Sequence, residues 1–465
     1  MTLNHRPWCV IGAGPSGLTA LKNLLAVGLS AVCLEREAGV GGNWNFGSGA
    51  SSVFASTRLI SSKTLTAYTD FPMPRDWPTH PNHQQCLEYL QAYAAHWHLL
   101  PHIRPHSVVK SVRPAGRNGG WVVEVAGQGA IECAGVVIAS GHNREPLWPE
   151  IPGTFSGSLL HACDYKSPTE PLAIGSRRVL VIGGGNSGCD IAVECSRHAA
   201  HTVHSTRRGY FVVPRQIRGR PADLRLERLL KLGLPLWLRR FLSLRAIDQT
   251  IGLPWRHGLQ QPDHRLWEAH PVINDSLYEC IDAGRIVPAG GVERFEGSTV
   301  VFADGTREAF DIVICATGYR LSLPWIAPEI LCMRQGIPQL FLNLLHPQRD
   351  DIAICGLIQP DSGQWGLTDL QGMVIARMAL ARTCSPAASA WLYRQRQAGG
   401  SEARARGGIR HIDTPRHALE VEHFAYRRQM QRLIDGLDRR LRKTIREWAQ
   451  AGDCQRLPPA PAARD

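Results

Sequence analysis

Two strand–glycine–helix units constrain the fold of this chain more than any other feature of its sequence. The first spans residues 7–35 and contains GAGPSG, and the second spans residues 177–207 and contains GGGNSG. In each unit a short β-branched run leads into the glycines, helical apolar spacing follows, and a second apolar run ends the unit. We therefore expect an α/β fold with two nested Rossmann-like dinucleotide-binding domains.

The glycines of both units have the G-x-G-x-x-G spacing of a nucleotide-binding turn. The first glycine makes the turn, the second lets a pyrophosphate approach the backbone, and the third lets helix and strand pack closely. The helix N-terminus then faces the phosphates. The candidate cofactor-binding residues are Gly12, Gly14 and Gly17 in the first unit and Gly183, Gly185, Asn186, Ser187 and Gly188 in the second.

The residues that end the second apolar run differ between the two units. The first unit ends in Glu35, an acid suited to two ribose hydroxyls, and we assign this unit to FAD. The second ends in Ser205, Thr206 and Arg207. A hydroxyl and a guanidinium favour a 2′-phosphate, which predicts NADPH over NADH. The alternative is that Arg207 merely begins a basic stretch.

That basic stretch, residues 207–257, is called the insertion below. It holds twelve Lys and Arg against three Asp and Glu, a net charge of 12 − 3 = +9, within a chain of net charge +12. Its centre has amphipathic helical spacing interrupted by Gly233 and Pro235. We interpret it as a substrate lid or an insertion packed on the NADP-binding domain, and the alternative is an element that lies on an anionic membrane surface.

Composition narrows the remaining classes of protein. No nucleic-acid recognition motif accompanies the positive charge, so we expect no nucleic-acid partner. The thirteen cysteines contain no CxxC pair and no zinc-ligand spacing, so we expect neither a dithiol relay nor a metal site. No uninterrupted apolar run of about 18 residues occurs, so we expect no transmembrane helix and a cytoplasmic location. The oligomeric state stays open.

The segment between the two units carries a motif with a family resemblance. Phe155, Gly157, His161 and Tyr165 fit the pattern FxGxxxHxxx(Y/F) of the flavin-containing monooxygenases, which are class B flavoprotein monooxygenases. SSKTLTAYTDFP, RRGYFVVPR, HPVINDSL, ATGY and GLIQP also resemble blocks of that family. The resemblance adds six candidate cofactor contacts: Arg36, Gly42, Trp44, Tyr165, Gly318 and Gln371.

The resemblance implies a reaction. NADPH reduces FAD, O₂ forms a flavin hydroperoxide, and a nitrogen or sulfur of a small lipophilic substrate takes an oxygen atom. The family usually has Asn three positions before the lysine that corresponds to Lys63, but this chain has Ile60. Because isoleucine donates no hydrogen bond, either Ser61 or Ser62 substitutes, which makes them the candidate catalytic residues, or the hydroperoxide is less well stabilised.

Two other functions stay open. One is Baeyer–Villiger-type oxygenation or oxidative decarboxylation of a keto acid, although the related Baeyer–Villiger enzymes carry Trp where this chain has Tyr165. The other is a non-catalytic FAD- and NADP-binding redox protein, which Ile60 alone favours. We expect the FAD-binding domain to comprise residues 1–170 and 305–465, the latter with a helical tail, and the NADP-binding domain to comprise residues 171–304, with the active site between them.

Overall fold

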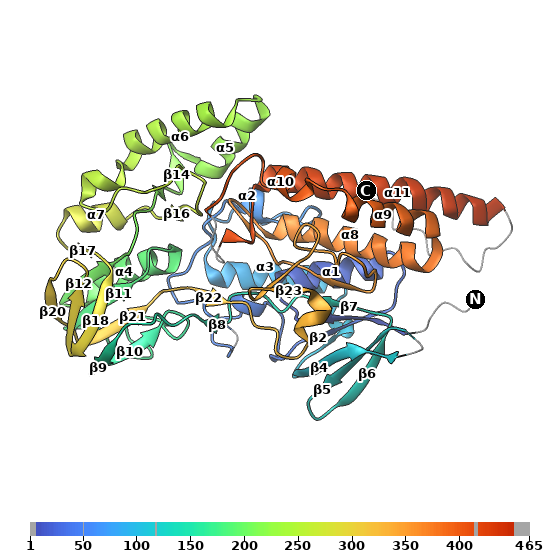
Figure 1. Ribbon diagram of the computed structural model, residues 1–465, viewed down its shortest axis with the longest axis horizontal. Helices are drawn as coiled ribbons and strands as arrows, with labels where there is room; N and C mark the ends of the chain where they lie inside the picture. The colour runs from blue at the N-terminus through green and yellow to red at the C-terminus, as the bar shows by residue number, and fades with distance from the viewer. Residues whose placement is uncertain (1–5, 50, 117–118, 413–416, 451–465) are drawn as a thin grey trace.

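The computed structural model describes residues 6–49, 51–116, 119–412 and 417–450. Both predicted units form, each in its own lobe of the molecule (Figure 1). The first consists of β1 (Trp8–Ile11), α1 (Pro15–Ala26) and β2 (Ala31–Leu34). The second consists of β11 (Arg178–Ile182), α4 (Asn186–His198) and β12 (His201–Ser205).

Each unit lies in the middle of a parallel sheet. The first sheet has the order β25 (Ile352–Ile354), β7 (Gly135–Ile138), β1, β2 and β3 (Ile103–Arg104). The second has the order β10 (Ser158–His161), β21 (Ile312–Cys315), β11, β12 and β17 (Val287–Ala289). The central strands are buried along their length, which explains why they are continuous apolar runs. The predicted α/β class with two nested dinucleotide-binding domains is confirmed.

Strand pairing moves the domain boundaries that we predicted at residues 170 and 304. β10 lies before residue 170, and β21 lies after residue 304, yet both belong to the second sheet, where His161 pairs with Cys315. β9 (Gly153–Phe155) also pairs with a strand of the second lobe, β18 (Val292–Gly297). The second lobe therefore includes residues 153–161 and 312–315. The sequence did not show this, because an apolar strand has the same pattern whichever sheet it joins.

The chain passes between the lobes along two paired linkers. β8 (Glu145–Pro146) pairs antiparallel with β22 (Tyr319–Arg320), and Arg320 forms an ion pair with Glu145. The His161 ring packs edge-on against Trp148 at 5.5 Å and Tyr319 at 5.4 Å between ring centroids. The motif histidine therefore packs against both of the linkers that connect the lobes.

Helices cover one face of the first sheet, and an antiparallel sheet covers the other (Figure 1). On one side lie α3 (His83–His96), α8 (Trp365–Cys384), α9 (Pro386–Gln397) and α11 (His423–Gln450). On the other lie β4 (Val109–Pro114), β5 (Trp121–Val125) and β6 (Gly129–Cys133). The predicted helical tail is confirmed, because α11 lies within it.

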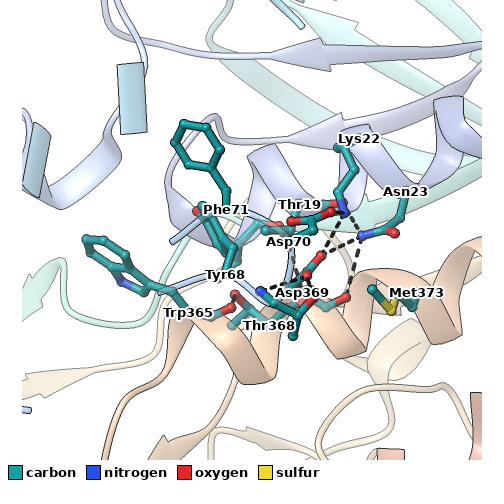
Figure 2. A network of polar contacts seen from close by, with 12 residues as sticks. Thr19, Lys22, Asn23, Tyr68, Asp70, Phe71, Trp365, Thr368, Asp369 and Met373 are labelled. Carbon is teal, nitrogen blue, oxygen red and sulfur yellow. Dashed lines mark hydrogen bonds and ion pairs between the residues drawn. The ribbon is translucent and has the colours of Figure 1, made fainter. Parts of the chain in front are cut away.

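A buried polar network joins α1 to α8 inside this core (Figure 2). The Lys22 ammonium on α1 lies 3.1 Å from Asp369 Oδ1 on α8 and 2.6 Å from Asp70 Oδ2. Asn23 Nδ2 donates to Asp369 Oδ1 at 3.0 Å, and the Thr69 hydroxyl donates to Asp369 Oδ2. Because every oxygen of the Asp369 carboxylate has a partner, the buried charge is compensated.

The insertion folds as two helices, α5 (Ala222–Lys231) and α6 (Leu236–Ile251), with the break at residues 232–235 where it was predicted. Figure 1 shows the pair above the second lobe. Ala246 and Ile247 of α6 pack in a cluster with Phe211 and Trp267, so the insertion is packed on the protein. Trp237 remains 69% exposed. Within the described residues, no helix has the length and apolar content needed to cross a bilayer.

Candidate functional site

The first glycine turn lies at the carboxyl end of β1. Gly12 has φ +101°, and a Cβ there would lie 2.7 Å from the carbonyl oxygen of Ala139 on the neighbouring β7 segment. A Cβ on Gly17 would lie 1.7 Å from the carbonyl oxygen of Gly12. Only glycine satisfies either position, so Gly12 makes the turn and Gly17 lets α1 pack against β1, as the motif predicts.

A second backbone segment approaches this turn closely. Gly42 begins η1 (Gly42–Trp44), and a Cβ on Gly42 would lie 2.9 Å from Gly14 Cα. The Trp44 ring packs edge-on against Trp365 at 5.6 Å, which holds the loop in place. The half-buried Gly14 and Gly42 thus form a surface of bare backbone that suits a pyrophosphate at the N-terminus of α1.

Glu35 follows β2 at the same edge of the first sheet. Its Oε2 accepts a hydrogen bond from the backbone N–H of Ala13 at 2.6 Å, and its Oε1 accepts one from Glu37 at 2.9 Å. These bonds fix the carboxylate beside the turn and leave lone pairs for ribose hydroxyls. Arg36 is half-buried and pairs with Glu37 at 3.2 Å. The residues present therefore fit an adenine dinucleotide.

The second glycine turn repeats this geometry at the end of β11. Gly183 has φ +132°, and a Cβ there would lie 2.2 Å from the carbonyl oxygen of Ala316. A Cβ on Gly188 would lie 2.0 Å from the carbonyl oxygen of Gly183. Gly185 is the N-cap of α4, and Asn186 Oδ1 accepts a hydrogen bond from Ile273 N at 2.7 Å. Ser187 in the first turn of α4 is exposed.

The residues after β12 separate into a structural pair and an exposed cation. The Ser205 hydroxyl is buried and donates to the Gly290 carbonyl at 2.6 Å, and Thr206 is buried beside it. Arg207 is exposed, and within the described part of the chain it forms no ion pair. Of the three residues predicted for the 2′-phosphate, Arg207 is therefore the one whose side chain is available.

Three predicted site residues lie inside the protein core instead. Tyr165 is 1% exposed, and its hydroxyl donates to Glu194 Oε2 of α4 at 2.8 Å. Gln371 has no exposed surface: its Oε1 accepts from Gly356 N at 2.8 Å and its Nε2 donates to the Tyr426 hydroxyl. Ser62 is also fully buried.

The cofactor contacts of Tyr165 and Gln371 and the reactant contact of Ser62 stay predictions, and the side chains of Tyr165 and Gln371 have structural partners inside the protein. The sequence pattern does not show that these polar residues are buried. Gly318, with φ +89°, is half-buried on the linker beside β22 and accepts a hydrogen bond from Leu147 N at 3.0 Å.

Ile60 and Ser61 line a cavity between the two lobes and the insertion, referred to below as the cavity. Ile273, whose N–H is bound by Asn186 at the start of α4, forms a wall from the second lobe. The Ser61 hydroxyl lies 2.8 Å from the Thr66 hydroxyl. The neighbouring Ser62 connects this segment to the insertion, because its N–H donates to Asp223 Oδ2 of α5 at 2.7 Å.

Several polar residues of the cavity were missed from the sequence. They come from four separate segments of the chain: His80, Arg215, Asp223, Arg225 and Asp361. Burial lowers the pKa of His80. Burial and then the nearby Glu422 carboxylate raise the pKa of Asp361 to about 8, so Asp361 is largely protonated at neutral pH. Arg215 and Asp361 lay within or beside family-like blocks, but no sequence signal marked the other three.

Two glycine turns, each at the carboxyl end of a parallel sheet and each followed by its own recognition residue, define a protein that binds two dinucleotides. The family model described as flavin-binding monooxygenase-like matches residues 6–411, and the chain belongs to this family. It is accordingly an FAD-dependent monooxygenase that uses NADPH and O₂.

Curated relatives cover most of the chain. It is 32% identical to flavin-containing monooxygenase 5 of Mus musculus over 435 residues, which cover 89% of this chain and 80% of the relative. It is 34% identical to flavin-containing monooxygenase 3 of Canis lupus familiaris over 389 residues, which cover 78% of this chain and 71% of the relative.

Solved structures share the fold at lower identity. S-allyl-L-cysteine S-oxygenase from Allium sativum superimposes with a TM-score of 0.66 at 19% identity, covering 92% of this chain and 88% of the other. A steroid monooxygenase bound to NADP superimposes with a TM-score of 0.69 at 17% identity, covering 92% of this chain and 98% of the other. These similarities support the two-dinucleotide arrangement of the fold.

Proposed function

We propose that this protein transfers an oxygen atom from O₂ to a nitrogen or sulfur of a small substrate bound in the cavity. The observation that carries this proposal is that the residues lining the cavity come from segments next to both glycine turns. Ile60 and Ser61 follow the loop of the first glycine turn, and Ile273 is bound to the start of α4 at the second turn. A substrate in the cavity would thus lie between the two nucleotide sites.

In this proposal the first lobe binds FAD and the second lobe binds NADPH. The backbone of Gly12, Gly14 and Gly42 would receive the FAD pyrophosphate, and Glu35 would bind the adenosine ribose. Arg207 would bind the 2′-phosphate that distinguishes NADPH from NADH. The bound flavin supplies the oxygen chemistry, and the protein supplies placement and a site shielded from water.

Ile60 gives this site an apolar wall where the family usually has an amide side chain. Ser61 is the adjacent cavity residue with a hydroxyl, and Thr66 Oγ1 holds that hydroxyl at 2.8 Å. Because the Thr66 hydroxyl donates to the Ser62 carbonyl at 2.8 Å, the Ser61 hydroxyl donates to Thr66 Oγ1 in this structure. We propose that the Ser61 hydroxyl turns from Thr66 to the reacting atoms when they are bound and so replaces the missing amide as hydrogen-bond donor. Ser61→Ala would then increase the fraction of NADPH that is oxidised without product, while Ser61→Thr would retain most of the coupling.

The oxygenation test uses FAD-loaded enzyme, NADPH and ¹⁸O₂ with an amine (dimethylaniline), a thioether (methyl phenyl sulfide) and a ketone (cyclohexanone). We expect an N-oxide and a sulfoxide that each carry one ¹⁸O. An ester as the main product would favour Baeyer–Villiger oxygenation. Flavin that NADPH does not reduce under anaerobic conditions would favour a non-catalytic binder.

The cytoplasmic location stays a prediction.

A further inference from the structure

Arg225 is the cation of the cavity without a partner. It lies on the first turns of α5, and its Nε is buried without a hydrogen-bond partner. In the part of the chain that the structure describes, no carboxylate lies within ion-pair distance of it. Arg225 is half-buried, and a buried N–H without a partner, such as its Nε–H, costs free energy unless a ligand completes it.

The other charged groups of the cavity are already engaged. Arg215 lies 2.9 Å from Asp275 and 4.0 Å from Asp190, so its charge is balanced, although its Nε is also buried without a hydrogen-bond partner. Asp223 Oδ1 accepts from Leu224 N and Oδ2 accepts from Ser62 N, and residues two apart on a helix do not face each other. His270 Nδ1 lies 3.5 Å from Glu420.

Asp361 does not balance Arg225 either. Its Oδ1 accepts a hydrogen bond from His423 N at 2.9 Å, and it lies near Glu422 and Glu420 in the protein interior. Crowding of these carboxyl groups favours the neutral acid at this position. In the described part of the chain, Arg225 is therefore the arginine of the cavity that no carboxylate pairs.

The rest of the cavity is mostly apolar. Its hydrophobic walls are formed by side chains from the FAD-side loop, the insertion and the segment before α7 (Leu277–Asp282), among them Ile60, Val213, Ile217, Leu226, Ile247 and Trp267. A ligand that matches these walls has an apolar body and one anionic group at its end. A planar carboxylate suits a guanidinium because the two groups can form paired hydrogen bonds.

We propose that the substrate of this enzyme is an acid: a small thioether or amine that carries a carboxylate bound by Arg225. This inference rests on the proposed oxygenation and specifies its substrate class. Arg225 is a specificity residue in this proposal, because it orients the substrate body along the apolar walls and does not take part in the oxygen transfer.

A matched pair of thioethers tests the proposal: 3-(methylthio)propanoate, and 3-(methylthio)propan-1-ol in which a neutral hydroxyl replaces the carboxylate. For the FAD-loaded enzyme we expect KM for the acid to lie at least about tenfold below KM for the alcohol. Arg225→Gln should remove this preference by raising KM for the acid far more than KM for the alcohol, and Arg225→Lys should retain part of it. Arg228→Gln, an exposed arginine one turn along α5, is the control.

Calorimetric binding of the acid to oxidised, FAD-loaded enzyme gives a second readout without turnover. The inference is supported if Arg225→Gln weakens binding of the acid about tenfold or more while Arg228→Gln leaves it intact. This holds even if neither thioether is oxygenated, and in that case the proposed function alone fails. Equal KM values for the two oxygenated thioethers, or an equal loss for both in Arg225→Gln, overturn the inference and leave the proposed function standing. Absence of acid binding and of acid turnover also overturns the inference.

Discussion

Ser62 donates its backbone N–H to Asp223 Oδ2 at 2.7 Å, a contact between residues 161 positions apart in the sequence. It joins the loop after the first glycine turn to the first turn of α5 in the insertion. Ser362 lies 3.4 Å from the same oxygen through its hydroxyl. This carboxylate thereby holds one wall of the cavity in place, which supports interpreting the insertion as a substrate lid.

Asp223→Ala should loosen that wall. Removing the acceptor leaves the buried N–H of Ser62 unpaired, which destabilises the contact between the loop and α5 by about 1–3 kcal/mol. We expect KM for the substrate to rise and the yield of hydrogen peroxide per NADPH to rise several-fold, because water reaches the site more easily. Peroxide and product are measured together. Glu227→Ala, which breaks the ion pair to exposed Lys231 on the same helix, is the control and should leave both unchanged.

Arg207→Ala should weaken the preference for NADPH. Loss of a charge-assisted contact of about 1.5–3 kcal/mol predicts a KM for NADPH roughly 10- to 100-fold higher, with KM for NADH nearly unchanged. Steady-state oxidation of both nucleotides measures the ratio. The neighbouring Arg208 lies 2.9 Å from Asp263 and is the matched control. If Arg208→Ala lowers the ratio as much as Arg207→Ala does, the charge of the insertion and not Arg207 selects the nucleotide.

Asp361→Asn should change how stability depends on pH. Burial and Glu422 raise the pKa of Asp361 in the folded protein to about 8, well above its ordinary value. The folded state therefore keeps a proton that the unfolded chain releases, and stability falls as the pH rises from about 4 to about 8. Asparagine does not ionise, so the Tm difference between variant and wild type should shift in favour of the variant as the pH rises from 6 to 8.5.

Asp263→Asn is the control for this titration. The His264 hydrogen bond and the Arg208 charge lower the pKa of Asp263, so its contribution is fully present above its ordinary pKa and is lost only on acidification. Its Tm difference from wild type should stay constant between pH 6 and 8.5. A constant difference for Asp361→Asn as well would contradict the raised pKa.

Asp369→Ala should be strongly destabilising. The change leaves the Lys22 ammonium with Asp70 alone and removes the acceptor of Asn23 and Thr69 (Figure 2). Breaking a buried ion pair from one side costs about 3–5 kcal/mol. Urea unfolding of the FAD-loaded protein measures the loss. Asp438→Ala breaks the more exposed pair with Arg377 between α8 and α11 and should cost about 1 kcal/mol or less. Equal losses in the two variants would show that the network contributes no more than a surface pair.

Local backbone geometry explains what could be predicted before the structure. Gly12, Gly17, Gly183 and Gly188 each occupy a position where a Cβ would overlap a backbone atom, so the motif alone predicts the turns and the helix packing. The insertion helices and their break at residues 232–235 follow from periodicity and from the helix-breaking effect of glycine and proline. These features depend on residues close together in the sequence.

Burial of polar side chains was not predictable in the same way. Tyr165 and Gln371 are family-like residues, but their partners are Glu194, Gly356 and Tyr426, which lie 15 to 55 positions away. No periodic pattern in the sequence shows that such a side chain is buried together with a distant hydrogen-bond partner. The same limit applies to β10 and β21, whose apolar runs fit either sheet.

The two dinucleotide turns can be identified from the amino-acid sequence, and so can the residues that distinguish them, Glu35 after the first and Arg207 after the second, because strand, turn and helix propensity act over a few neighbours. Which residues line the cavity depends on contacts between distant segments. Ile60, Asp223, Arg225 and Asp361 line one cavity although they belong to distant segments. Their proximity follows from the packing of the insertion on both lobes, and packing of this kind depends on the whole chain and leaves no local pattern.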